Sequence, residues 1–485
     1  MLVMMTILSS LRTAARTLSL PSPAYEGMAG AIARGAGWKL GADLLSRALQ
    51  YVLLWVAARS LGTVEFGDLT FGLALGYMLA PVADFGLQLF VQRELARLAV
   101  PGASARPYFK DEATAGRLVG GGLAIKLGLS AGATALLAGL VLLEPAGSKG
   151  AVLLLGMSMI ATGGLEYLTY CLRALGQLKY EALAIVLGRA TNLGLGVALL
   201  YMGAGVWGLA LAANVASIGA LAFAYRRLTR YVTPVWRPDP AFWARHIWQP
   251  TAVGVGVIFS IMSFRIDNLL ILPAAGREAL GLYNAAYKLF EPSLILPSVL
   301  LAAIFPLLGR RFGQHQHQHQ HQHRQADRTA ALQLAVQTLL ALLVLGGGAT
   351  LVLQAGALPL VNLLYGPQYA QSVPLLQVLA LACLPVYLNY GLTHMLIAMD
   401  RPHLYAAFTL CALVVNVAAN LSLLPTTGIW GAAAATVITE IALLALCSAA
   451  VVLYLRQPAH PHGRVKAGAG VEVEAGVKGQ PGGPA

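Results

Sequence analysis

Twelve long apolar runs are the feature of this sequence that most restricts its fold. Each run has about 20 or more mostly apolar residues, the length that a helix needs to cross a bilayer. Only 11% of the 485 residues are charged and 58% are hydrophobic, too much apolar surface for a soluble fold to bury. Lipid offers the backbone no hydrogen-bond partner, so the runs must be helical. They lie near residues 36–58, 66–90, 116–142, 150–172, 180–201, 205–225, 246–272, 279–305, 329–353, 372–398, 404–424 and 428–454.

The basic residues lie almost entirely on one side of the predicted membrane. They gather in the N-terminal segment, in every second connection between the runs and in the C-terminal tail. The other connections hold only Arg59, Lys149 and Arg277. Such a bias marks the cytoplasmic side, so both termini are predicted to be cytoplasmic. It also accounts for the net charge of +13 without a nucleic-acid partner.

The runs divide the chain into two halves of six helices each. We expect a cytoplasmic N-terminal extension over residues 1–35, an N-terminal six-helix lobe over 36–230 and a cytoplasmic linker over 231–245. A C-terminal six-helix lobe follows over 246–455, and the Gly- and Pro-rich tail over 456–485 is predicted to be disordered. The predicted fold is an all-α integral membrane protein with two pseudo-repeated lobes around a central cavity, as in many secondary transporters.

Matching motifs in the two halves support an internal repeat. The tetrapeptide Gly-aliphatic-Trp-Gly stands at 205–208 and again at 428–431, each time at the start of a predicted helix. Gly62-x4-Gly67 and Gly276-x4-Gly281 each lie between the first two helices of a half. Asn192 and Asn416 also correspond. Since glycine allows tight reversals of the chain, we expect sharp turns at these positions.

Five basic residues fall inside the apolar runs, where each costs roughly 2.5–3.5 kcal/mol if it faces lipid. They are therefore predicted to face a polar interior and to bind an anionic substrate: Arg47, Lys126, Arg189, Arg265 and Lys288. Their polar neighbours repeat at helical spacing on the same faces. The competing interpretation is that acids neutralise these bases inside a packed bundle, with Asp43–Arg47 and Lys288–Glu291 as pairs within one helix.

Several intramembrane acids are candidates for coupling transport to protons or sodium ions. They are Asp43, Asp84, Asp267 and Glu291, with Glu440 as a further possibility. A structural hydrogen bond is the alternative role for such acids. No metal or cofactor site is expected: the run His315–His323 reads as a low-complexity expansion in a cytoplasmic loop over 310–328, and the four cysteines read as small apolar residues.

Two stretches carry motifs that are specific enough to compare with known families. The first is 58–97, with Leu61-Gly62, Phe66-Gly67, Asp84-x-Gly86-Leu87 and Arg93. The second is 265–289, with Asp267, Gly276, Gly281 and Tyr283. Through these residues the chain resembles the polysaccharide flippases of the Wzx type, in the MOP transporter superfamily. The resemblance implies alternating access and transport of undecaprenyl-diphosphate-linked oligosaccharide across the bacterial inner membrane. It also implies a monomer that works with glycosyltransferases or a polysaccharide polymerase. Many relatives have 14 helices, whereas this chain has 12 runs.

Two other functions remain open on sequence grounds. A MATE-like exporter of drugs or metabolites belongs to the same superfamily, but it predicts acid-lined cavities for organic cations. A membrane glycosyltransferase or polymerase is less favoured, because the predicted external loops are short and carry no catalytic motif. We therefore expect a transporter and not an enzyme.

The predicted orientation can be tested with reporter fusions. Reporters at Lys149 and Thr426 should read as external, and reporters at Arg237 and Arg464 as cytoplasmic, because the basic connections stay on the cytoplasmic side. An external signal at Arg237 would contradict the whole arrangement.

Overall fold

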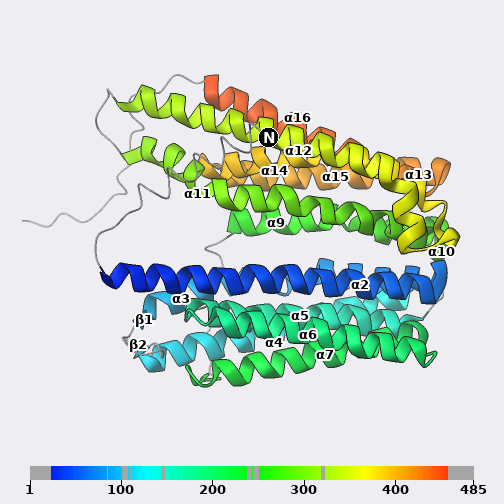
Figure 1. The fold of residues 1–485 in the computed structure, drawn as a ribbon, viewed down its shortest axis with the longest axis horizontal. Coiled ribbons are helices and arrows are strands. Elements are labelled where there is room, and N and C mark those ends of the chain that lie inside the picture. The colour runs from blue at the N-terminus through cyan, green and yellow to red at the C-terminus, as the bar shows by residue number, and fades with distance from the viewer. Residues whose placement is uncertain are drawn as a thin grey trace, which may run out of the picture.

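The computed structural model describes residues 23–84, 86–100, 108–109, 111–143, 148–236, 243, 251–317 and 323–456. Within these ranges the chain is almost entirely helical (Figure 1). The first half comprises α2 (Pro23–Val82), α3 (Leu87–Leu98), α4 (Glu112–Leu143), α5 (Lys149–Ala174), α6 (Leu178–Tyr201) and α7 (Gly205–Leu228). Two-residue strands β1 (Ala99–Val100) and β2 (Tyr108–Phe109) pair antiparallel between α3 and α4.

The second half runs from α9 to α16. It comprises α9 (Thr251–Ser263), α10 (Ile266–Phe290), the 3-10 turn η1 (Glu291–Leu294), α11 (Ile295–His317), α12 (His323–Leu364), the 3-10 turn η2 (Pro367–Tyr369), α13 (Ser372–Leu381), α14 (Cys383–Ala398), α15 (Pro402–Thr427) and α16 (Ile429–Arg456). Figure 1 shows α2–α7 gathered on one side of the molecule and α9–α16 on the other. We call these groups the N-lobe and the C-lobe.

The all-α membrane fold predicted from the apolar runs is confirmed. In the described ranges, nine helical segments are long and apolar enough to cross a membrane, and α2 with α3 adds a bent tenth. Two of these ten segments, residues 254–302 and the bent pair, each contain a reversal and therefore count as two crossings. The total is consistent with the twelve predicted runs. The most buried spans are α5 in the N-lobe and α13–α14 in the C-lobe, the fourth of the six predicted runs in each half.

The two reversals occur at corresponding glycines. Gly62 (φ 71°, ψ −177°) interrupts α2, and Gly276 (φ 82°, ψ −179°) interrupts α10 with nearly the same backbone conformation. Beyond Gly276 the chain doubles back. This is shown by the Tyr283 hydroxyl, which donates to Asp267 Oδ2 at 2.6 Å although the two residues are 16 positions apart. Beyond Gly62 it also doubles back: Gln50 and Tyr77 line one small cavity, although a straight helix would separate them by about 40 Å. We call residues 41–82 and 266–290 the N-hairpin and the C-hairpin.

The two hairpins pack against each other through the second glycine of each motif. A Cβ atom at Gly67 would lie 2.2 Å from the Arg277 carbonyl oxygen, and one at Gly281 would lie 1.9 Å from the Thr63 carbonyl oxygen. Each glycine thus receives the backbone of the other hairpin, and the contact is reciprocal. This explains why the Gly-x4-Gly spacing occurs in both halves: the first glycine turns the chain and the second admits the partner backbone.

The repeated Gly-aliphatic-Trp-Gly motif marks a second pair of turns. Gly205 (φ 53°) and Gly428 (φ 60°) both have positive φ angles, directly before α7 and α16. Trp207 and Trp430 are half-exposed on the outer surface. The predicted turns are therefore present at both sites. In the predicted loop 310–328, α11 continues to His317 and α12 begins at His323, while residues 318–322 lie outside the described ranges, as do residues 1–22 and 457–485.

A substitution at the reciprocal contact should destabilise the protein. Gly67→Ala places a methyl group against the Arg277 backbone, which cannot move without shifting the C-hairpin. Overpacking of this kind costs about 1–3 kcal/mol, so thermal unfolding of the detergent-solubilised protein should begin several degrees lower. The control is Gly219→Ala on α7, where no atom lies within 4 Å of the new methyl group. Equal unfolding curves for the two variants would contradict the tight contact.

Candidate functional site

A cavity of about 730 Å³ lies between the two lobes. Its N-lobe wall comes from both arms of the N-hairpin together with α3, α4, α5 and α6, and its C-lobe wall comes from α9, α10 and η1. A smaller cavity of about 110 Å³ adjoins it and shares several lining residues, among them Gln50, Tyr77, Arg189, Lys288 and Glu291. We call the two together the interlobe cavity.

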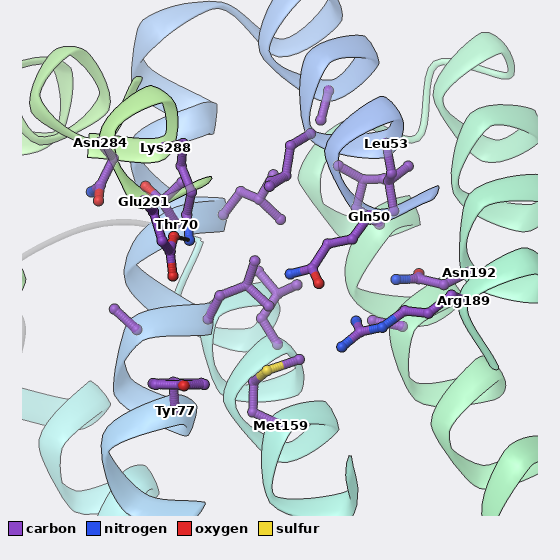
Figure 2. A pocket seen from close by; sticks show the side chains of 18 of the residues that line it. Gln50, Leu53, Thr70, Tyr77, Met159, Arg189, Asn192, Asn284, Lys288 and Glu291 are labelled. Carbon is purple, nitrogen blue, oxygen red and sulfur yellow. Dashed lines mark hydrogen bonds and ion pairs between the residues drawn. The ribbon is translucent and has the colours of Figure 1, made fainter. Parts of the chain in front are cut away.

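All five predicted intramembrane cations line the interlobe cavity. Arg47, Lys126, Arg189 and Lys288 line the larger part, and Arg265 lines the smaller part. Figure 2 shows Gln50 and Arg189 extending from one wall toward Lys288 and Glu291 on the other. The prediction that the cations face a polar interior is thus consistent with their placement. Their binding of substrate stays a prediction.

Two of the cations share one carboxylate. Arg265 donates to Glu291 Oε1 at 2.5 Å, and Lys288 donates to Glu291 Oε2 at 2.7 Å. The Arg265 guanidinium also lies over the rings of Tyr77 and Tyr287, 5.1 and 5.4 Å from their centroids. Pro292 has no backbone N–H group to donate to the preceding helical turn, and the chain forms the 3-10 turn η1 directly after α10. This break places the Glu291 carboxylate between the two bases.

Lys126 has a partner that same-helix spacing could not reveal. Its ammonium group lies 3.0 Å from Asp84 Oδ1, and its side chain is only 2% exposed. Asp84 belongs to the turn between α2 and α3, where Gly86 has φ 82° and Leu87 N donates to the Asp84 carbonyl. The Asp84-x-Gly86-Leu87 motif therefore forms the turn that brings a carboxylate to α4. Asp84 holds a lysine in place, and its role in ion coupling stays a prediction.

Arg47 and Arg189 have no carboxylate within ion-pair distance among the described residues. Of the two same-helix pairs in the competing interpretation, Lys288–Glu291 is formed and Asp43–Arg47 is not. Asp43 instead faces Lys39, with 3.7 Å between the charged atoms. Arg189 lines the cavity beside Asn192, whose buried Oδ1 has no hydrogen-bond partner in the described structure. The acid that acts most strongly on Arg189 is Glu166 in the same cavity wall, which forms no ion pair with it, and the Arg47 guanidinium repels it more weakly. Arg47 and Arg189 are therefore the cations best placed to accept an anion that enters the cavity.

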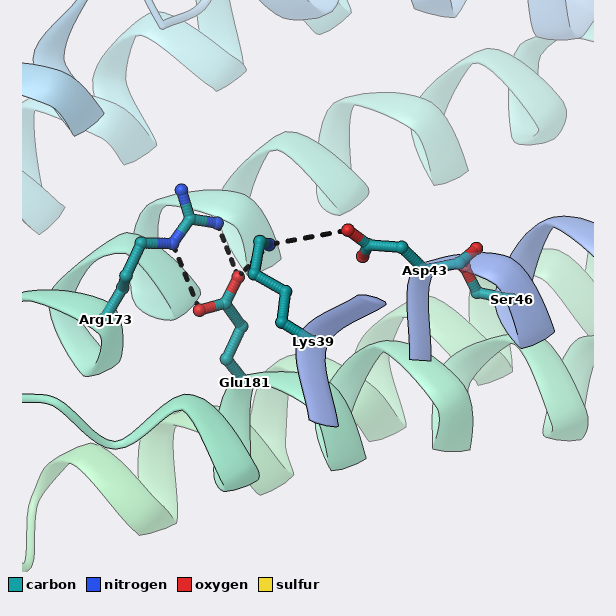
Figure 3. Close-up of polar contacts among 5 residues, drawn as sticks. All are labelled: Lys39, Asp43, Ser46, Arg173 and Glu181. Atoms are coloured by element: carbon teal, nitrogen blue, oxygen red, sulfur yellow. Dashed lines mark hydrogen bonds and ion pairs between the residues drawn. The ribbon is translucent and has the colours of Figure 1, made fainter. Parts of the chain in front are cut away.

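A second charged cluster holds the start of the N-hairpin against α6 (Figure 3). Glu181 is fully buried, with Arg173 at 2.5 Å and Lys39 at 2.7 Å from Oε1. Lys39 and Arg173 contribute to the basic bias of the sequence, which does not reveal their contact with Glu181. The only signal for this cluster in the sequence is Glu181, an acid in the first turn of a predicted helix that follows a basic loop. The cluster is structural and fixes α2 relative to α5 and α6.

Asp267 lies outside the interlobe cavity, in the core of the C-lobe. It is 1% exposed and accepts hydrogen bonds from Tyr283 at 2.6 Å, Asn420 at 2.9 Å and Thr436 at 3.2 Å. Arg265 and Asp267, two residues apart in the sequence, thus point to different sides. Of the ion-coupling candidates, Asp43, Asp84 and Glu291 line the cavity and Asp267 does not. In the described ranges, no group of three or more His, Cys, Asp or Glu side chains could hold a metal ion.

One end of the interlobe cavity is closed by contacts between the lobes, near the two hairpin turns. Asp68 and Arg277 form an ion pair at 3.1 Å across the hairpin contact. The Tyr369 hydroxyl donates to the Ala58 carbonyl at 3.0 Å, and Arg59 donates to the carbonyls of Leu363 and Leu364. Sequence reasoning did not find these residues as a set, because every pair is more than 200 positions apart. We call this the closed end.

Comparison with known families decides which group of proteins the chain belongs to. Residues 32–312, more than half of the chain, match the family model described as "Polysaccharide biosynthesis protein". The chain belongs to the polysaccharide biosynthesis protein family. The match runs from within α2 to within α11 and so includes every predicted cation of the interlobe cavity. A comparison with curated protein sequences found no significant match.

Solved structures show the same fold as this family member. An inward-facing MATE multidrug resistance transporter of the MOP superfamily has a TM-score of 0.69 at 16% identity, over 84% of this chain and 94% of that one. The outward-facing conformation of a MATE transporter scores 0.57 at 15% identity, covering 87% and 96%. A MOP superfamily transporter from Pyrococcus furiosus, described as having a binding pocket of reverse polarity, scores 0.53 at 15% identity, covering 87% and 94%. The chain is therefore a multi-pass membrane protein with a transporter fold.

The Lys126–Asp84 pair should make the single and double substitutions differ in stability. Lys126→Gln leaves the buried Asp84 carboxylate without its partner, which costs about 3–5 kcal/mol for a buried pair. The double variant Lys126→Gln with Asp84→Asn removes both charges and should recover most of that loss. Thermal or chemical unfolding in detergent measures the difference. If the double variant were no more stable than Lys126→Gln, the pair would not be the reason for the loss.

Proposed function

We propose that the protein is a flippase that moves undecaprenyl-diphosphate-linked oligosaccharide across the bacterial inner membrane for the synthesis of cell-surface polysaccharide. It does so by alternating access between its two lobes, without chemical change to the substrate. Both termini lie in the cytoplasm in this proposal, because the basic connections lie on their side of the membrane. The family supports a role in polysaccharide biosynthesis, and the fold supports transport.

The observation that carries the proposal is the pair of unpaired guanidinium groups in the interlobe cavity. Arg265, Lys288 and Lys126 already have carboxylate partners, so Arg47 and Arg189 hold the positive charge that remains uncompensated by ion pairs among the described residues. Guanidinium groups bind phosphate oxygens in a planar, two-bond geometry. A lipid diphosphate would satisfy both arginines, and Gln50 and Asn192 beside them offer further hydrogen-bond groups.

The dimensions of the cavity suit a headgroup with sugars. At about 730 Å³, its larger part lies in the upper range of sites that enclose drug-sized ligands. The lining mixes charged, amide and hydroxyl side chains with leucines and isoleucines, as sugar rings with polar edges and apolar faces require. By the basic-residue bias, the closed end faces the outside, and the substrate would enter from the cytoplasmic side.

An apolar groove offers a path for the lipid tail. It has a volume of about 470 Å³ and lies between α2 and α6, lined by Trp38, Gly41, Ala42, Leu45, Ala182, Leu183 and Val186. These α2 residues alternate with Asp43, Ser46 and Arg47, which line the cavity from the same helix. A polyprenyl chain could therefore lie in the groove while its diphosphate reaches Arg47, without the whole lipid leaving the membrane.

The second candidate function is export of a drug or metabolite, as in MATE transporters. The similarity of fold favours it, and so do the acids Asp43, Glu166 and Glu291 in the cavity wall. It requires a cavity that attracts cations. Glu166 is an acid of the cavity wall without an ion-pair partner among the described residues, but two unpaired arginines, Arg47 and Arg189, outnumber it. A glycosyltransferase or polymerase remains the least supported alternative.

Substitution of the unpaired arginines tests the flippase proposal. Arg189→Gln should leave the protein folded and weaken binding of the lipid diphosphate by about 10- to 100-fold, because a charge-assisted hydrogen bond contributes about 1.5–3 kcal/mol. Arg189→Lys should keep part of the activity if charge alone matters and little of it if the planar geometry matters. The measurement is transport of a fluorescent undecaprenyl-diphosphate-linked sugar in proteoliposomes.

The control for this test is Lys179→Gln, which removes an exposed cation outside the cavity. It should transport as the unchanged protein does. Normal transport by both Arg189→Gln and Arg47→Gln would rule out the cationic cavity as the substrate site and favour the exporter.

A further inference from the structure

The C-lobe contains a second, separate cavity of about 150 Å³. It lies among α9, α14, α15 and α16, and its polar lining includes Ser260, Asn389, His394, Thr409 and Glu440. None of these residues lines the interlobe cavity. The transport proposal above gives this polar cavity no role.

Glu440 is a buried acid without a cationic partner. It is 5% exposed, and no lysine or arginine lies within ion-pair distance among the described residues. The titratable groups that face it are Tyr390 and His394 on α14, Tyr405 on α15, Cys447 on α16 and Tyr287 on α10. His394 Nδ1 lies 2.7 Å from the Tyr390 carbonyl, which fits a neutral ring with its proton on Nδ1. An ionised Glu440 would thus be an uncompensated buried charge, which is costly.

The contact of Glu440 with Asn389 shows how the charge is removed. Asn389 Nδ2 donates to Glu440 Oε2 at 2.8 Å and to the Glu440 carbonyl at 2.9 Å. Asn389 is 3% exposed, and its Oδ1 is buried without a hydrogen-bond partner. A carboxylate has no hydrogen to offer this acceptor. A protonated carboxyl group does, and an acid and a primary amide side by side form two hydrogen bonds, one in each direction.

We propose that Glu440 and Asn389 form a proton-binding site in the C-lobe. A hydronium ion in the C-lobe cavity transfers its proton to the free carboxyl oxygen of Glu440 and becomes water, and the new O–H group donates to Asn389 Oδ1. When the proton leaves, the carboxylate remains and Asn389 Oδ1 again lacks a donor. Binding of the proton is the one step that both removes the buried charge and satisfies the unpartnered acceptor.

Helix α9 connects this site to transport. Gly254, Val257, Ile258 and Ile261 of α9 line the interlobe cavity, while Ser260 and Ser263 of the same helix line the C-lobe cavity. Loss of the proton leaves a charge beside α9 that draws water toward it, which would favour a different position of that helix. The link to transport rests on the proposed function, whereas the proton site itself does not.

Infrared difference spectroscopy tests the site without any substrate. The full-length protein is titrated with acid and base in detergent, in H₂O and in D₂O, without sodium. We expect a carboxylic-acid carbonyl band that appears with proton binding, shifts in D₂O and is lost in Glu440→Gln. Gln keeps the shape of the protonated acid and should fold. The control, Glu278→Gln, removes an exposed acid and should keep the band.

Three outcomes would overturn the proposal. The first is that the unchanged protein shows no such band at any pH. The second is that Glu440→Gln keeps the band. The third is that sodium at constant pH removes the band only when Glu440 is present, which would make the site a cation site. The first of these needs no variant. Failure of sugar-lipid transport with an intact band would reject the proposed substrate and leave the proton site standing.

Discussion

The reciprocal contact between Gly67 and Gly281 is the constraint on which the rest of the structure depends. Each glycine accepts the backbone of the opposite hairpin at a distance that no side chain would allow. The lobes are therefore joined directly at the closed end, with the Asp68–Arg277 ion pair beside the contact. The cavity lies between the lobes on the other side of this junction. A transporter that opens to both sides must separate these two hairpins, so the contact that closes the cavity is also one that has to break.

Electrostatics divides the intramembrane cations into two groups. Lys126, Arg265 and Lys288 are held by Asp84 and Glu291, and those pairs fix the turn after α2 and the break after α10. Arg47 and Arg189 come from two helices of the N-lobe and have no such partner among the described residues. A buried pair stabilises its surroundings only while both partners remain, whereas an unpaired base in a water-filled cavity can accept a ligand. In the flippase proposal, the paired cations maintain the shape of the cavity and the unpaired ones supply its affinity for anions.

The sequence predicted the parts of this structure that repeat along one helix or between the halves. Apolar runs predicted the membrane helices, the Gly-x4-Gly spacing predicted the two turns, and the i, i+4 neighbours of Arg47 and Lys288 predicted which faces line the cavity. Partners on different helices could not be predicted, because helical periodicity relates only residues on the same helix. Lys126 and Asp84 are 42 positions apart, and Lys39 and Glu181 are 142 apart. The same limit explains why the sequence could not show that Tyr283, Asn420 and Thr436 surround Asp267 in the C-lobe core, and the role of Asp267 in ion coupling stays a prediction.

The central claim is that the interlobe cavity recognises a lipid diphosphate and not an organic cation. Equilibrium binding to the unchanged, detergent-solubilised protein tests it most directly, with three probes: an undecaprenyl-diphosphate disaccharide, the matching undecaprenyl alcohol and tetraphenylphosphonium. The account predicts that only the diphosphate lipid binds tightly, that inorganic pyrophosphate competes with it and that salt weakens it. Tight binding of tetraphenylphosphonium, with none of the diphosphate lipid, would contradict the account and support an exporter.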